Sequence, residues 1–253
     1  MPNTKIYVEQ RTYKLKELAP IIAVDPQNRN LKRAVKTKLN GMGFIEGQHY
    51  SFPEHRNGII TILWVPTKAE DKIQYLVRLL GIDKQVDSWS FAVFVYRLLH
   101  DKDFNCMPWA EREAYLFDND EIKVSERTLR KWTSKLIDMD AVIKDDDDYQ
   151  WWKTESYEGY KIRTPLDVDD EEINNYREFC HDFFEREDVK KMDKKTRGYQ
   201  FFTESWNKFG CKFYKCHAFL FGAWHTEILE ELINIIDDYV EQKWDEIIES
   251  QKQ

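Results

Sequence analysis

The strongest constraint on the fold is the stretch Lys123–Thr154, in which a helical pattern runs directly into a strand-like pattern. Ser125 is a favourable N-cap for the predicted helix, because its hydroxyl can accept a backbone N–H of the first turn. Apolar side chains recur at helical spacing and would face a core: Leu129, Trp132, Leu136 and Met139. Basic and polar side chains take the opposite face: Arg127, Arg130, Lys131 and Ser134.

After this helix the sequence predicts a two-stranded wing. Residues 141–144 and 149–153 are strand-like, and the acidic run Asp145–Asp148 between them is expected to form the turn. A capped helix followed by a hairpin resembles a winged helix-turn-helix, whose helix lies in the major groove of DNA. The preceding segment, Pro108–Leu116, would be the helix that crosses the DNA backbone.

A second pattern of this kind lies near the N-terminus. Leu31–Met42 predicts a helix, and its basic stripe consists of Arg29, Lys32, Arg33 and Lys36. Strand-like segments at 44–52 and 59–65 follow it, and the Asn57-Gly58 dipeptide between them is a strong hairpin signal. We expect the helix to enter the major groove, with His55 and Arg56 of the hairpin tip near the backbone or minor groove.

The segment at 43–50, Gly-Phe-Ile-Glu-Gly-Gln-His-Tyr, follows this helix. It resembles the DNA-binding modules of phage antirepressors and related phage regulatory proteins. The resemblance is confined to the N-terminal helix and hairpin, and the preceding helix departs from the usual pattern of these modules. It implies a phage, prophage or plasmid setting. Two winged helices in tandem also resemble plasmid initiators, in which two such units grip successive grooves of one site.

Charge is distributed unevenly along the chain. Residues 1–80 carry 13 Lys and Arg against 7 Asp and Glu, whereas the balance is 11 against 18 in residues 81–160 and 14 against 21 in residues 161–253. The N-terminal third is basic and the rest of the chain is acidic. We therefore expect any nucleic acid to contact the N-terminal third first. The expected fold is mainly α with small β-hairpins (α+β). Its domains are a basic winged-helix-like unit at 1–80, an acidic winged-helix-like unit at 81–163 and a helical region at 164–253.

The second unit allows two interpretations. Arg127, Arg130 and Lys131 would contact DNA as their N-terminal counterparts do. The acidic residues beside them would repel phosphate, however: Asp145, Asp146, Asp147 and Asp148. The alternative is a protein-binding unit that uses these aspartates, with Trp151 and Trp152 as anchors. Adjacent strand residues point to opposite faces, so one of the two indoles is expected to lie in the core.

Catalysis has little support in the sequence. It contains no Walker-type loop, no G-x-S-x-G and no H-E-x-x-H motif, so we predict no enzymatic activity and no cofactor. Cys211, Cys216, His217 and His225 have atoms suited to zinc, but their spacing is not a standard ligand pattern, and we predict no metal. No apolar run is long enough for a bilayer, and no secretory signal is recognisable. We expect a cytoplasmic protein with reduced cysteines and no membrane contact.

These observations favour a non-enzymatic protein that binds duplex DNA, either a transcriptional regulator or a replication initiator of a mobile element. The long acidic helix predicted at Ile228–Ile248 would pair with a second copy or with a host protein. The alternative function is a phage-encoded inhibitor or adaptor, of the anti-CRISPR kind, whose acidic surfaces block a nucleic-acid-binding partner.

Overall fold

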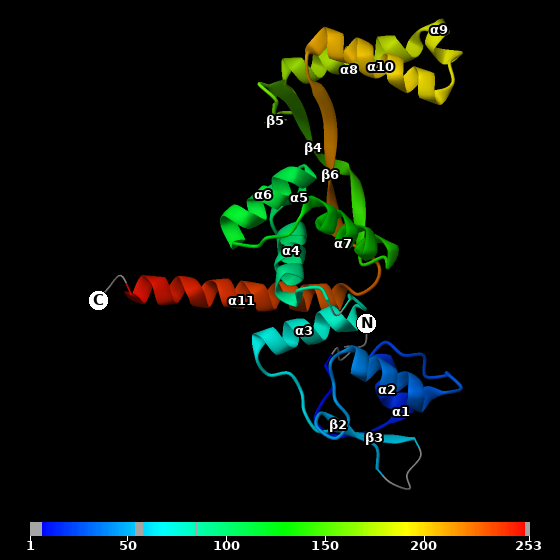
Figure 1. Ribbon diagram of the computed structural model, residues 1–253, viewed down its shortest axis with the longest axis vertical. Coiled ribbons are helices and arrows are strands. Elements are labelled where there is room, and N and C mark those ends of the chain that lie inside the picture. Colours follow the sequence, from blue (N-terminus) through cyan, green and yellow to red (C-terminus); the bar gives the residue numbers. More distant parts are fainter. Residues whose placement is uncertain (1–6, 54–57, 84, 251–253) are drawn as a thin grey trace.

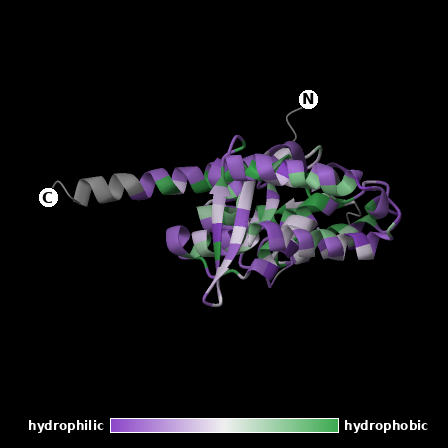
Figure 2. Cartoon of the chain, turned by 90° about the horizontal axis from the view of Figure 1, so that it is seen from above, coloured by the Kyte–Doolittle hydropathy of each residue, from purple (hydrophilic) through white to green (hydrophobic). Residues whose placement is uncertain are grey.

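The computed structural model describes residues 7–53, 58–83 and 85–250. Within these residues the protein is mainly helical and contains two antiparallel sheets of three strands each (Figure 1). The expected α+β class is therefore confirmed. Hydrophilic residues predominate along the outer helices, and hydrophobic residues gather where the helices of the body lie together (Figure 2). Among the described helices, none combines the length and the apolar character needed to cross a bilayer.

The N-terminal unit is built from a strand, two helices and a hairpin. Its elements are β1 (Thr12–Lys14), α1 (Leu15–Ile21), α2 (Leu31–Gly41), β2 (Tyr50–Ser51) and β3 (Ile59–Ile62). The strand order is β1-β3-β2, with both pairings antiparallel. Ile60 and Ile62 point inward from β3, as the two-residue period of a strand requires. The helix and the hairpin predicted from the sequence are thus both present.

The central body consists of three helices around a shared core. They are α3 (Ala69–Leu79), α4 (Ser88–His100) and α11 (Thr226–Ser250). The carboxylate of Asp87 caps α4 by accepting the N–H groups of Trp89 and Ser90. The helix α4 is apolar on most sides and packs against both α3 and α11. One continuous hydrophobic cluster therefore includes residues from all three predicted domains, whose boundaries stay a prediction.

The segment that we predicted to be a second helix-turn-helix follows α4. It comprises α5 (Lys102–Asn105), α6 (Trp109–Asp120) and α7 (Glu126–Asp138). The Ser125 side chain accepts the N–H of Thr128, so the predicted N-cap is confirmed. The predicted core face is confirmed as well, since Leu129, Trp132 and Leu136 are buried and Met139 is half-buried.

The predicted two-stranded wing that turns at Asp145–Asp148 is wrong. One strand, β4 (Val142–Tyr157), runs through the acidic segment and pairs with β5 (Tyr160–Leu166) and β6 (Lys212–Phe221). Lys144 pairs with Phe219, and Tyr149 pairs with His217. An advance of five residues along β4 is therefore paired with an advance of only two residues along β6. The aspartates are accommodated as a bulge, which keeps their charges in solvent without reversing the chain.

The true hairpin turn lies between β4 and β5. Glu158 and Gly159 form it, and both have positive φ angles, of 49° and 86°. Two consecutive left-handed residues match the right-handed twist of the strands in a two-residue hairpin. The turn is therefore formed by Glu158 and Gly159, and not by the aspartates at which we predicted it.

A helical insertion separates β5 from β6. It contains α8 (Glu171–Glu185), α9 (Glu187–Lys190) and α10 (Lys194–Phe209), and it lies at the end of the molecule opposite the N-terminal unit (Figure 1). Its apolar side packs on the sheet in a second hydrophobic cluster: Trp151, Leu166, Ile173, Tyr176, Cys211 and Phe213. This cluster fixes the far ends of β4 and β6 relative to each other.

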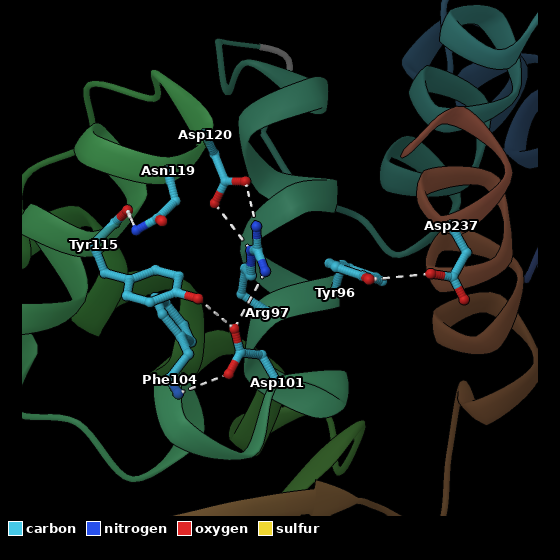
Figure 3. Close-up of polar contacts among 8 residues, drawn as sticks. All are labelled: Tyr96, Arg97, Asp101, Phe104, Tyr115, Asn119, Asp120 and Asp237. Atoms are coloured by element: carbon cyan, nitrogen blue, oxygen red, sulfur yellow. Dashed lines mark hydrogen bonds and ion pairs between the residues drawn. The ribbon is translucent and has the colours of Figure 1, made fainter. Parts of the chain in front are cut away.

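A polar network at Arg97 ties α4 to its neighbours (Figure 3). The Arg97 Nε and Nη2 atoms donate to the two carboxylate oxygens of Asp120 at 3.0 and 2.7 Å, which joins α4 to α6. Nη1 donates to Asp101 at 3.2 Å, and Asp101 also accepts the Tyr115 hydroxyl at 2.8 Å. These groups are partly shielded from solvent, so their hydrogen bonds are stronger than those of exposed ion pairs.

We expect Arg97→Lys to lower the free energy of unfolding by about 1–2 kcal/mol, because an ammonium cannot reproduce the forked contact with Asp120. Urea unfolding followed by tryptophan fluorescence measures the change. Arg127→Lys is the matched control, since Arg127 is an exposed arginine of α7. Equal unfolding free energies for the two variants would show that the network adds no stability.

Candidate nucleic-acid interface

The helix α2 presents the first candidate surface. Val35 and Leu39 are fully buried and anchor α2 on the N-terminal core. The predicted basic stripe points away from that core, and all four of its members are exposed: Arg29, Lys32, Arg33 and Lys36. The sequence therefore placed this surface correctly, because the apolar and basic stripes of one amphipathic helix must lie on opposite sides.

Most of this charge is available to a ligand. Lys36 pairs with Glu46 at 2.6 Å, but both side chains are about half exposed, and such pairs contribute little. The Lys32 ammonium lies 4.7 Å from the ring centroid of Phe52, just after β2. Within the described part of the chain, no carboxylate pairs with Arg29 or Arg33.

Two other lysines of the basic helices have a structural role. The Lys38 ammonium donates to the carbonyl of Leu79 at 3.0 Å, and Lys135 donates to the carbonyl of Gly81 at 2.7 Å. Both carbonyls lie at the C-terminal end of α3, where backbone acceptors lack partners within the helix and the dipole favours a cation. Burial lowers the pKa of Lys38. These two hydrogen bonds therefore connect α2 and α7 to the same segment, the C-terminal end of α3.

His55 and Arg56, which we predicted to lie near the DNA backbone or minor groove, fall outside the described residues. The flanking strands β2 and β3 are paired, with Tyr50 opposite Ile62.

The helix α7 presents a second basic face. Arg127, Arg130 and Lys131 are exposed, as predicted from their spacing. Arg130 forms an i,i+4 ion pair with Glu126 at 2.8 Å, and its guanidinium lies 5.4 Å from the ring of Trp109 on α6. This face carries less unpaired charge than the face of α2.

The residues expected to bind a protein partner do not form one exposed surface. Asp146, Asp147 and Asp148 are exposed, and Asp146 pairs with Lys144 at 3.0 Å. Both indoles are buried, contrary to the expectation that they anchor a partner: Trp151 is 7% exposed and Trp152 is 8% exposed. They point to opposite faces of β4, and because apolar packing covers each face, neither indole reaches the surface.

The sequence missed a further basic region. Arg130 also lines a groove between α6 and the sheet, together with Arg112, Lys161 and Lys212. These residues come from α7, α6, β5 and β6, which are spread widely along the sequence. No spacing rule could have collected them, because the β5-β4-β6 pairing brings the two lysines together and the two arginines come from separate helices beside that sheet.

The candidate zinc ligands are distributed over different environments. Cys211 lies in the second hydrophobic cluster, Cys216 and His217 line the groove beside α6, and His225 precedes α11. Burial raises the pKa of Cys216 to about 11, so its thiol is protonated at neutral pH. Across the described ranges, no three His, Cys, Asp or Glu side chains gather into a potential metal site.

Comparison with known proteins adds no relative. No family model, no curated protein and no solved structure matches this chain. Any functional assignment therefore rests on the residues and on the geometry described above.

Proposed function

We propose that this protein binds duplex DNA without catalysing a reaction, and that α2 is the helix that enters the major groove. The observation that carries the proposal is the exposed basic stripe at α2, in which Arg33 of the helix and Arg29 just before it have no carboxylate partner in the described part of the chain. Guanidinium groups suit this role because they make forked contacts with phosphates and with guanine edges.

The arrangement around α2 supports the proposal. The order strand, helix, helix and hairpin, with β3 between β1 and β2, holds α2 against the core and leaves its outer face open. This order is the one expected of a winged helix-turn-helix. The face of α7 would add backbone contacts through Arg127 and Lys131, which are exposed. A regulator or replication initiator of a mobile element is the activity that we propose.

The proposal is tested by binding of the purified protein to random-sequence duplex DNA across a salt series. The test variant carries Arg29→Ala, Lys32→Ala, Arg33→Ala and Lys36→Ala. Each phosphate contact that is lost lowers the slope of log affinity against log salt concentration by about 1. For the test variant we expect the magnitude of this slope to be smaller by about 2–4 than for wild type. We also expect much weaker binding at low salt.

The matched control removes four exposed lysines from the helical insertion: Lys191, Lys194, Lys195 and Lys208. It changes the net charge equally, so it separates a specific surface from general attraction to a polyanion. If wild type fails to bind DNA at low salt, or if both variants lose affinity equally, α2 is not a DNA-binding helix. Capture of a protein partner through the aspartates would then become the better hypothesis.

A further inference from the structure

A groove with a volume of about 760 Å³ lies between α6 and one face of the sheet. Pro108 and Trp109 at the start of α6 line one side, together with Arg130 and Glu126 of α7, which pair with each other at 2.8 Å. The opposite wall is formed by side chains of the sheet, among them Thr154, Lys161 and Lys212. None of the basic residues that we propose for DNA binding at α2 lines this groove.

Arg112 lines this groove and is 2% exposed. Its Nε donates to the carbonyl of Phe104 at 3.1 Å, and Nη2 donates to the carbonyl of Asn105. The remaining nitrogen, Nη1, is buried without a hydrogen-bond partner among the described residues. No carboxylate in that part of the chain pairs with the guanidinium, which instead lies 4.4 Å from the ring of Trp109.

A buried cation without a counter-ion is costly, and it creates a strong positive potential in its surroundings. Loss of solvation lowers the pKa of Arg112 to about 10, so the group is still charged at neutral pH. The main-chain carbonyls of Phe104 and Asn105 are dipoles and do not cancel a full charge. The groove above Arg112 is therefore a favourable place for an anion.

The sheet adds cations on the same side. Thr154 of β4 is opposite Arg163 in β5 and Lys212 in β6, and Ser156 is opposite Lys161. Directly opposed residues share a face of a sheet, so these three cations project together. Arg163 is neutralised by Glu111 at 3.0 Å. Lys161 and Lys212 are exposed, and no carboxylate of the described chain pairs with either.

The start of α6 completes the site. Pro108 occupies the N-cap position, and its ring cannot accept a hydrogen bond from the first turn. The first backbone N–H groups of α6 therefore have no side-chain cap, and Pro108, Trp109 and Ala110 at this positive end of the helix dipole line the groove. Helix N-termini of this kind bind phosphate through their N–H groups.

We propose that this groove binds a phosphate group, held by the N-terminus of α6 together with Lys161 and Lys212, above the uncompensated charge of Arg112. Three independent features converge there: a buried arginine with an unpartnered nitrogen, two unpaired lysines and an uncapped helix start. The phosphate is supplied either by the backbone of a nucleic acid or by a free nucleotide. The site does not depend on the proposed role of α2.

The test uses the full chain with Lys161→Ala and Lys212→Ala combined, and Lys194→Ala with Lys195→Ala as the control of equal charge. Calorimetry measures binding of inorganic pyrophosphate and ATP at low salt. Binding of labelled duplex DNA is measured by fluorescence anisotropy with proteins that also carry the four α2 substitutions. These substitutions remove the other proposed DNA-binding surface. Loss of two charge-assisted contacts is expected to weaken binding of at least one probe by about tenfold or more, while the control binds like its parent.

The probes distinguish the two sources of phosphate. If pyrophosphate or ATP depends on Lys161 and Lys212, the ligand is a free phosphate compound, and if DNA alone depends on them, it is a nucleic-acid backbone. Either result supports the site. The proposal fails if no probe binds the parent proteins, or if the groove variant binds every probe as tightly as the control.

Arg112→Met provides a second measurement. It removes the buried charge and keeps an unbranched side chain, and circular dichroism shows whether the variant folds. A folded Arg112→Met protein is expected to lose phosphate affinity, and unchanged affinity would exclude Arg112 from the site. If the variant does not fold, the lysine pair alone decides the proposal.

Discussion

Leu232→Ala is expected to lower the free energy of unfolding by about 2–5 kcal/mol. Leu232 is fully buried in the main hydrophobic cluster, where α11 packs against α4 and α3. Truncation removes apolar contacts and leaves a cavity that the surrounding helices fill only in part. Urea unfolding followed by far-ultraviolet circular dichroism measures the loss. Asn234→Ala, at an exposed position two residues later on α11, is expected to change stability little.

This variant also tests how α11 is used. We predicted that the C-terminal helices pair with a second copy, yet Leu229, Leu232 and Ile236 lie in the core of their own chain. A loss of stability that is independent of protein concentration is expected, because the contacts are intramolecular. If the loss varied with concentration, α11 would be stabilised by association instead. The homodimer itself stays a prediction.

The sequence predicted the elements that depend on local information. The helices α2 and α7 were located correctly, as was the cap at Ser125, because helical periodicity and capping are determined within a few neighbouring residues. The basic face of α2 followed for the same reason. An amphipathic helix with a buried Val35 and Leu39 leaves its charged stripe outside whatever it packs against.

What the sequence did not predict depends on distant partners. The aspartates at 145–148 have turn-forming propensity, but β6 lies more than sixty positions further on and holds both sides of that segment in one strand. The helical insertion between β5 and β6 hides this pairing from any local window. The groove around Arg112 was missed for the same reason, because its lysines become neighbours only through the β5-β4-β6 sheet.

The contact between α5 and β6 is the strongest example of such a distant partner. The Asn105 side chain accepts the N–H of Phe219 at 2.8 Å and donates to the carbonyl of Phe219 at 2.9 Å. The strand β6 is at the edge of its sheet, so its outward backbone groups have no neighbouring strand. The amide of Asn105 takes the place of a peptide group there, and it covers part of an edge that would otherwise be open to pairing.

Asn105→Ala is therefore expected to lower the free energy of unfolding by about 2–5 kcal/mol, since it leaves a buried donor and a buried acceptor of Phe219 unpaired. Asn105→Asp tests the geometry, because it keeps the shape of the side chain but places an oxygen against the carbonyl of Phe219. We expect it to destabilise the protein at least as much as alanine does at neutral pH, where a buried carboxylate is also poorly solvated.

Thermal and urea unfolding of both variants, beside Asn119→Ala as the control, measure these effects. Asn119 is exposed on α6, and its amide donates to the carbonyl of Tyr115 within the same helix, so its loss is expected to cost little. If Asn105→Ala unfolds like the control, water satisfies Phe219 and the edge of β6 is not held by α5. If Asn105→Asp is much more stable than Asn105→Ala, the donor to the Phe219 carbonyl is dispensable, and only the acceptor for its N–H stabilises this junction.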